Sequence, residues 1–90
     1  MLFMVIERFR DGDAAAVYRR HRERGRMLPE GLRYVDSWVE PDFGRCFQLM
    51  ECGDPQLIRQ WTARWEDLVD FEVVAVVTSK EAAEAISPLL

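Results

Sequence analysis

Two residues of this sequence are the best suited to acid–base chemistry, a histidine at position 21 and an early glutamate at position 7. His21 is the only histidine, and its spacing from Val17 and Tyr18 places all three on one face of a helix. Histidine changes charge near neutral pH, so on an inward face it can move a proton or bind a ligand. The simpler alternative is a partly buried histidine that fills the seam between helix and sheet. His21 is therefore a candidate catalytic and ligand-binding residue.

Glu7 is the second candidate catalytic residue because of its expected position. It falls late in one expected strand, and Glu40 falls late in another. If the two strands run in the same direction, both carboxylates lie at one end of the sheet, where paired acids can share a proton and one becomes a general base. Arg45 opens the next expected strand and would lie near both acids, so a solvated cluster of ion pairs is the alternative.

Several aromatic residues have the pattern of a pocket lining. Tyr34, Asp36 and Trp38 alternate along one expected strand, which puts an acid between two aromatic side chains on one face. That arrangement suits a small ligand, and it equally suits a dimer contact. Trp61 and Trp65 are one helical turn apart and are most simply core residues. The candidate ligand-binding residues are His21, Tyr34, Asp36, Trp38, Trp61 and Trp65.

The two cysteines favour no special chemistry. Cys46 and Cys52 lie six positions apart in one expected strand, too far apart for a disulfide bond. Neither has a neighbouring histidine or lysine in the sequence, so we expect small buried hydrophobic side chains rather than reactive thiols. One histidine and two thiols from one strand do not converge on an ion. We expect neither a metal site nor a cofactor.

Composition and charge restrict the class of protein. The 90 residues predict a single domain, residues 1–90, and 49% hydrophobic with 31% charged residues is typical of a globular chain. The net charge of −4 argues against general nucleic-acid binding. No apolar run approaches the roughly 18 residues of a membrane span, and the apolar start lacks the basic lead-in of a signal peptide. With reduced thiols, these features predict a cytoplasmic protein without membrane or nucleic-acid partners.

The elements that must position these side chains follow the order strand, helix, strand, strand, helix, strand, then a helical tail. Asp13, Asp54 and Thr78 are the expected N-terminal caps, and Gly25 is the expected end of the first helix. The expected strands are residues 2–9, 32–40, 45–52 and 71–77. The first expected helix is residues 14–24, and the second begins at Asp54 and Pro55 and carries an apolar stripe to Leu68. A third, short helix is expected from Ser79 to about Ile86.

A four-residue loop, Pro41 to Gly44, joins the second and third expected strands and sets their register. That loop would place Glu40 opposite Arg45, Trp38 opposite Phe47, Asp36 opposite Leu49, and Tyr34 opposite Glu51. The element order predicts an α+β, ferredoxin-like βαββαβ fold with a four-stranded antiparallel sheet and two helices on one face. Since the strands are apolar on both sides, a second copy of the chain is expected to cover the other face.

This layout resembles that of a known family. The resemblance rests on Trp38, the segment from Cys46 to Glu51, the helix around Trp61 and Trp65, and the strand from Phe71 to Val74. The chain is similar to small bacterial domain-of-unknown-function proteins of the dimeric α/β-barrel superfamily. The resemblance implies a homodimer whose sheets pack face to face, with a small-molecule pocket between sheet and helices. The superfamily includes cofactor-independent monooxygenases, haem-degrading oxygenases, muconolactone isomerases, stress-response proteins and ligand-sensing domains, so it fixes no activity.

Three functional hypotheses follow, and whether the protein is an enzyme stays open. The first is a homodimer that binds a small molecule in a pocket formed by some of the candidate residues. The second is a cofactor-independent monooxygenase or isomerase-like enzyme in which His21 or Glu7 takes a proton from an acidic carbon or a phenol. The third is a structural or protein-interaction module whose arginine-rich helix, with Arg19 to Arg26, docks an acidic partner.

Overall fold

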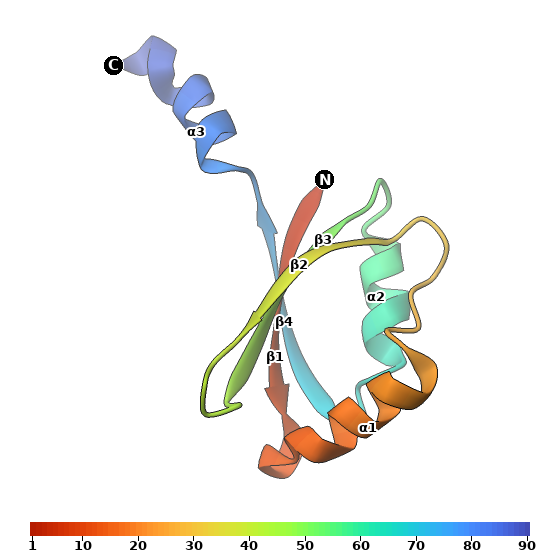
Figure 1. Cartoon of the computed structure of the whole chain (residues 1–90). Helices are drawn as coiled ribbons and strands as arrows, with labels where there is room; N and C mark the ends of the chain where they lie inside the picture. Colours follow the sequence, from red (N-terminus) through yellow and green to blue (C-terminus); the bar gives the residue numbers. More distant parts are fainter.

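The computed structural model describes residues 1–90 and contains one four-stranded sheet with the strand order β2-β3-β1-β4. Every neighbouring pair of strands is antiparallel. Helices α1 and α2 cover one face of this sheet, whereas α3 stands away from it (Figure 1). This is the ferredoxin-like α+β fold that the element order predicts. The elements are β1 (Leu2–Phe9), α1 (Ala14–Arg24), β2 (Arg33–Val39), β3 (Arg45–Glu51), α2 (Gln56–Ala63), β4 (Val69–Val76) and α3 (Ser79–Ile86), with 3-10 turns at Arg10–Gly12 and Ser87–Leu89.

The first and last helices begin and end where their capping residues predict. Asp13 accepts a hydrogen bond from the main-chain N–H of Ala16 at 3.1 Å, which satisfies one of the free donors at the start of α1. Gly25 ends α1 at a positive φ of 66°, and its N–H donates to the carbonyl of His21. Thr78 caps α3 by accepting from the N–H of Glu81 at 3.1 Å. These three predictions are confirmed.

The second helix is shorter than its apolar stripe predicts. α2 ends at Ala63, and the chain continues in turns until β4 begins at Val69, two residues earlier than expected. Trp65 therefore lies beyond the helix, but its N–H still donates to the carbonyl of Thr62, so the turn keeps its indole on the inner side. The stripe remains buried because these turns continue the path of the helix for one more turn.

A β-bulge in β2 changes the register that the loop predicts. Trp38 pairs with Phe47 and Asp36 pairs with Leu49, as expected, but Tyr34 pairs with Met50 rather than with Glu51. The shift lies between Tyr34 and Asp36, where one extra residue enters the strand. Directly opposed residues share a face, so Tyr34 faces the helices and Asp36 and Trp38 face the other way. The prediction that all three side chains share one face is wrong.

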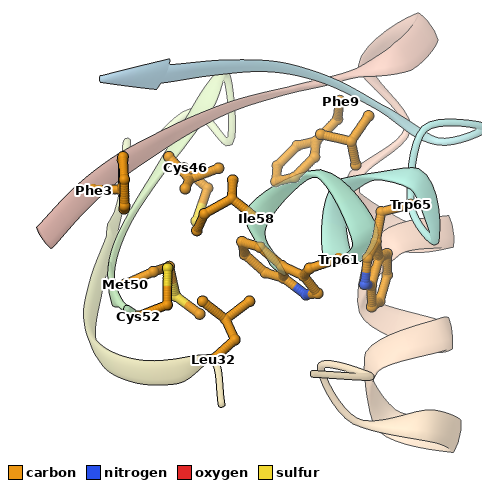
Figure 2. Packing of buried hydrophobic residues seen from close by; sticks show 11 residues of the cluster. Phe3, Phe9, Leu32, Cys46, Met50, Cys52, Ile58, Trp61 and Trp65 are labelled. Carbon is orange, nitrogen blue, oxygen red and sulfur yellow. The ribbon is translucent and has the colours of Figure 1, made fainter. Parts of the chain in front are cut away.

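The hydrophobic core fills the space between the sheet and α2 (Figure 2). Trp61 is its largest fully buried side chain, with 1% of its surface exposed, and Trp65 is 5% exposed. Both indole N–H groups donate to the carbonyl of Arg26, at 2.8 and 3.0 Å, and so join the segment after α1 to the core. Their prediction as core residues is confirmed. The cluster comprises Phe3, Val5, Phe9, Leu32, Cys46, Met50, Cys52, Ile58, Trp61, Trp65 and Val69.

The face of the sheet opposite the helices has nothing packed over it (Figure 1). The half-buried side chains of Met4, Ile6, Phe47 and Leu49 lie on this open face, beside the exposed Trp38. All residues from position 77 to position 90 are also exposed, so α3 has no packing partner in its own chain.

None of the helices has the length and apolar character needed to cross a membrane.

Candidate functional site

A cavity of about 140 Å³ lies between the helix-facing side of the sheet and the two covering helices. Four of the seven residues that the sequence singles out line it, namely Glu7, His21, Trp61 and Trp65. Most of the remaining wall is apolar or aromatic, and the polar exceptions lie together on one side. The other lining residues are Phe9, Val17, Tyr18, Arg26, Ser37, Val39, Cys46 and Gln48.

Glu7 is the only acidic residue in the core, and it is 6% exposed. It lies on β1 between the buried Val5 and Phe9, because alternate residues of a strand face the same side. Gln48 of β3 donates a hydrogen bond from Nε2 to Oε1 of Glu7 at 2.9 Å. Burial raises the pKa of the Glu7 carboxyl above its usual 4.5, and the hydrogen bonds with Gln48 and Cys46 and the charge of Arg26 oppose that rise without cancelling it.

Gln48 connects Glu7 to a positive charge at the cavity wall. The Nε atom of Arg26 donates to Oε1 of Gln48 at 3.1 Å, so the Gln48 amide is fixed at both ends. The guanidinium carbon of Arg26 lies 3.6 Å from the ring centroid of Tyr34, a cation–π contact that holds the side chain in place. The Tyr34 hydroxyl in turn forms a 2.6 Å hydrogen bond with Ser37. We call the chain of contacts Arg26, Gln48 and Glu7 the polar relay.

The thiol of Cys46 is buried next to Glu7 and is not poised as a nucleophile. Burial, followed by the Glu7 charge, raises the pKa of Cys46 to about 12, so it is a neutral thiol at neutral pH. Burial also raises the pKa of Cys52. Both cysteines are free and buried, which confirms that they act as small hydrophobic residues.

His21 lies at the mouth of the cavity rather than inside it. Its side chain is exposed, and its ring forms no hydrogen bond with another protein group. Tyr18, one turn earlier on α1, also borders the mouth and contacts the rings of Phe9 and Phe43 edge to face, with centroids 6.3 and 6.1 Å apart. His21 therefore lies between the cavity and the solvent.

Two predicted groupings do not form, namely the shared face of Tyr34, Asp36 and Trp38 and the pairing of Glu7 with Glu40. Asp36 and Trp38 face away from the cavity, and Trp38 is 51% exposed on the open face. Glu40 forms a two-pronged ion pair with Arg45, at 2.7 and 3.2 Å, and does not pair with Glu7. The Arg45 hydrogen bond lowers the pKa of Glu40, whereas burial raises that of Glu7, so the two carboxyls do not share a proton. Tyr34 reaches the site only through Arg26 and Ser37.

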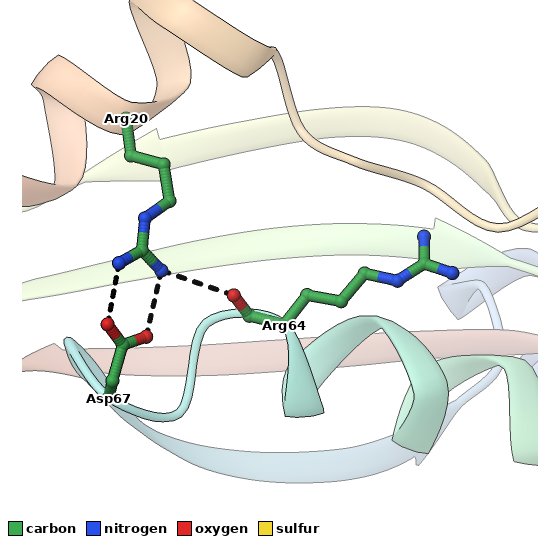
Figure 3. A network of polar contacts seen from close by, with 3 residues as sticks. All are labelled: Arg20, Arg64 and Asp67. Carbon is green, nitrogen blue, oxygen red and sulfur yellow. Dashed lines mark hydrogen bonds and ion pairs between the residues drawn. The ribbon is translucent and has the colours of Figure 1, made fainter.

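The arginine run along α1 is divided between structural and solvent-facing roles. Arg20 forms two hydrogen bonds with Asp67, at 2.8 and 2.5 Å, and a third with the carbonyl of Arg64 (Figure 3). These contacts fasten α1 to the turn that follows α2. Arg26 enters the polar relay, while Arg19, Arg22 and Arg24 remain exposed. Arg19, Arg20 and Arg24 border a second, open hollow, but Arg22 and Arg26 do not, so the run as a whole does not line a single groove.

Sequence reasoning missed Arg26 and Gln48, the two residues that give the site its polarity. A signal existed for Gln48, because it alternates with Cys46 and Met50 on the buried side of β3, where a polar residue needs a partner. No signal distinguished Arg26 from its neighbours in the arginine run. It follows Gly25 directly, and the positive φ of that glycine ends α1 and redirects the chain.

Glu7 should give the stability of the fold a distinct pH dependence. Between pH 4.5 and the raised pKa, the folded protein holds a proton on Glu7 that the unfolded chain has released. The stabilisation from protonated Glu7 is complete below pH 4.5 and is lost as the pH rises through the raised pKa. We therefore expect Glu7→Gln to be more stable than the native protein in urea unfolding at neutral pH, with the difference vanishing toward pH 4.5. A difference that does not change with pH would show that Glu7 titrates normally.

The site combines a buried carboxyl, an amide held by hydrogen bonds at both ends and a guanidinium in a cavity whose wall is otherwise mostly apolar or aromatic. A carboxyl in such surroundings can accept a hydrogen bond from a bound molecule or take a proton from it. No cluster of three or more histidine, cysteine, aspartate or glutamate side chains has the arrangement of a metal site. No curated protein and no solved structure matches the chain. The family model described as a domain of unknown function (DUF3303) matches residues 1–90, and the chain therefore belongs to that family over its whole length.

Proposed function

We propose that the protein binds a small molecule in the cavity beside Glu7. The observation that carries this proposal is a carboxyl group only 6% exposed that lines a cavity of about 140 Å³. Ligand pockets are mostly apolar with a few polar groups that fix orientation, and this cavity has that composition. An engineered apolar cavity of about 150 Å³ accommodates benzene, so the size suits a molecule with a single ring.

The stability cost of Glu7 supports a functional role. Its neighbours along the same face of β1 are apolar, and an apolar side chain in its place would avoid the cost of burying a carboxyl. Selection for folding alone does not explain a destabilising buried carboxyl, whereas residues that lower stability are common in active and binding sites. The polar relay reduces the cost but leaves the pKa of Glu7 raised.

Native mass spectrometry of the purified protein tests the proposal. We expect a non-covalent adduct that is retained under gentle desolvation and released under harsh desolvation. Val17→Phe provides the matched control, because Val17 lines the cavity from α1 and a larger ring there fills the space. The adduct should be absent from this variant. An adduct that Val17→Phe retains would place the ligand elsewhere, and bare chains that also show no thermal stabilisation by single-ring molecules would contradict ligand binding.

A second candidate function is cofactor-independent enzymatic proton transfer. The raised pKa of Glu7 in an apolar cavity favours it, because a base whose pKa is nearer the working pH is a better proton acceptor. In this candidate function Glu7 takes a proton from an acidic carbon or a phenol, and His21 exchanges it with solvent at the mouth. Incubating the recovered adduct with fresh protein separates the two functions, since an enzyme converts it and a binding protein returns it unchanged.

We propose further that the protein is a homodimer of the dimeric α/β-barrel type. Two surfaces of the chain support this. The open face exposes apolar side chains around Phe47 and Leu49, and the C-terminal segment exposes Val77 just before α3 and Ile86 at the end of α3. An isolated helix of eight residues is marginal in water, so α3 needs a surface to pack on. A second copy related by a two-fold axis covers both surfaces at once.

A further inference from the structure

The cavity has two charged groups of opposite sign on one wall that do not neutralise each other. Glu7 and Arg26 both line the cavity, yet no ion pair joins them. The Gln48 amide stands between them, accepting from Arg26 at 3.1 Å and donating to Glu7 at 2.9 Å. A direct ion pair would satisfy both charges, whereas this arrangement leaves each of them free to bind a further group.

Glu7 has unused capacity to accept hydrogen bonds. An ionised carboxylate offers about four acceptor positions. Within the protein, Gln48 fills one with an N–H, and the Cys46 thiol supplies a weak contact. Because the side chain is 6% exposed, bulk solvent does not supply the rest. A ligand hydroxyl at this end of the cavity would do so.

Arg26 has unused capacity to donate. Its Nε is bonded to Gln48 and its plane is stacked on Tyr34, but neither of its terminal amino groups donates to a protein acceptor. The stacking also holds the guanidinium in one orientation, which reduces the entropy lost when it binds a planar anion. Carboxylates are the natural partners of a guanidinium, because two parallel hydrogen bonds form.

Building on the proposed binding function, we propose that the ligand is a small cyclic hydroxy acid. Its ring fills the space between Phe9, Trp61 and Trp65, its hydroxyl donates to Glu7, and its carboxylate accepts from Arg26. Since one amide group spans the gap between Glu7 and Arg26, the two polar groups of the ligand are close together, as in 3-hydroxybenzoate. The positive charge of Arg26 disfavours cationic ligands at the same wall.

Isothermal titration calorimetry with four probes tests this assignment. The probes are 3-hydroxybenzoate, benzoate, phenol and benzylamine. We expect 3-hydroxybenzoate to bind most tightly, with a loss of about tenfold or more when either the hydroxyl or the carboxylate is missing, since a hydrogen bond to a charged group contributes that much. Benzylamine should bind the least tightly of the four.

Two variants then assign each polar group of the ligand to its partner. Glu7→Gln should abolish the gain in affinity from the ligand hydroxyl and keep the gain from the ligand carboxylate. Arg26→Gln should abolish the gain from the carboxylate and keep the gain from the hydroxyl. Arg26→Gln keeps the main-chain carbonyl that both indoles contact, so the core retains its hydrogen bonds. Arg22→Gln, on the exposed side of α1, is the matched control for lost charge and should change nothing.

The outcomes separate this inference from the function on which it rests. If phenol or benzylamine binds and the carboxylate of 3-hydroxybenzoate adds no affinity, the hydroxy-acid assignment is overturned and the cavity remains a binding site. Tighter binding of benzylamine than of 3-hydroxybenzoate would overturn it in favour of a cationic ligand. Absence of binding by all four probes, with every variant folded, would overturn both the assignment and the proposed function.

Discussion

Replacing Trp61 with alanine is expected to lower the free energy of unfolding by about 3 to 5 kcal/mol. Trp61 is 1% exposed, and its ring centroid lies 6.3 Å from that of Phe71 on β4. Its indole N–H also fixes the carbonyl of Arg26 at 2.8 Å. The substitution leaves a large void at the centre of the core. Because domains of this kind have total stabilities of about 5 to 15 kcal/mol, the loss removes a large share of the whole.

Urea unfolding followed by circular dichroism at one fixed protein concentration measures this effect. Trp61→Phe is the matched control, because it keeps an aromatic ring in the same space and Trp65 still donates to the carbonyl of Arg26. We expect Trp61→Phe to be clearly more stable than Trp61→Ala. A cost below about 1 kcal/mol for Trp61→Ala would mean that the site collapses around the void and that the core is not organised around this indole.

Replacing Leu49 with arginine is expected to weaken the proposed dimer by at least about a hundredfold. Leu49 lies near the centre of the open face, with Met4 and Asp36 as its partners on the neighbouring strands. In a dimer with its sheets face to face, each copy would bury one arginine without a partner, and an unpaired buried charge costs several kcal/mol. In a monomer the same arginine stays in solvent and costs little.

Sedimentation velocity over a range of concentrations gives the readout for Leu49→Arg. The native protein should sediment as a dimer and the variant as a monomer with an unchanged far-ultraviolet circular dichroism spectrum. Gln60→Arg adds the same charge to the exposed side of α2 and should remain dimeric. A native chain that sediments as a monomer throughout, or a Leu49→Arg variant that stays dimeric, would contradict dimerisation through the open face.

The fold was predictable because its signals are local. The alternation along β1, the caps at Asp13 and Thr78 and the stop at Gly25 each act within a few residues of themselves. Local signals fail where the chain breaks its own period. No glycine or proline near Val35 indicates the bulge in the sequence, so the predicted pairing partner of Tyr34 was wrong.

The site was less predictable because its geometry comes from residues far apart in the sequence. Glu7 and Gln48 are 41 positions apart and meet only because β1 pairs with β3. The tryptophans were recognisable from helical spacing, but the carbonyl of Arg26 that both contact was not. Glu40 pairs with Arg45, as the alternative of an ion-pair cluster predicts, and not with Glu7. Tertiary pairing, and not residue type, decides which acids meet.

Nuclear magnetic resonance titration with single-ring molecules tests most directly whether the cavity beside Glu7 binds a ligand. The signals to follow are the indole N–H signals of the three tryptophans. Trp61 and Trp65 line the cavity, and Trp38 on the open face is the internal reference. We predict that at least one probe shifts the Trp61 and Trp65 signals to saturation without moving Trp38, and that Val17→Phe abolishes both shifts. Signals that no probe moves, or shifts that persist in the filled variant, would contradict a ligand site at Glu7.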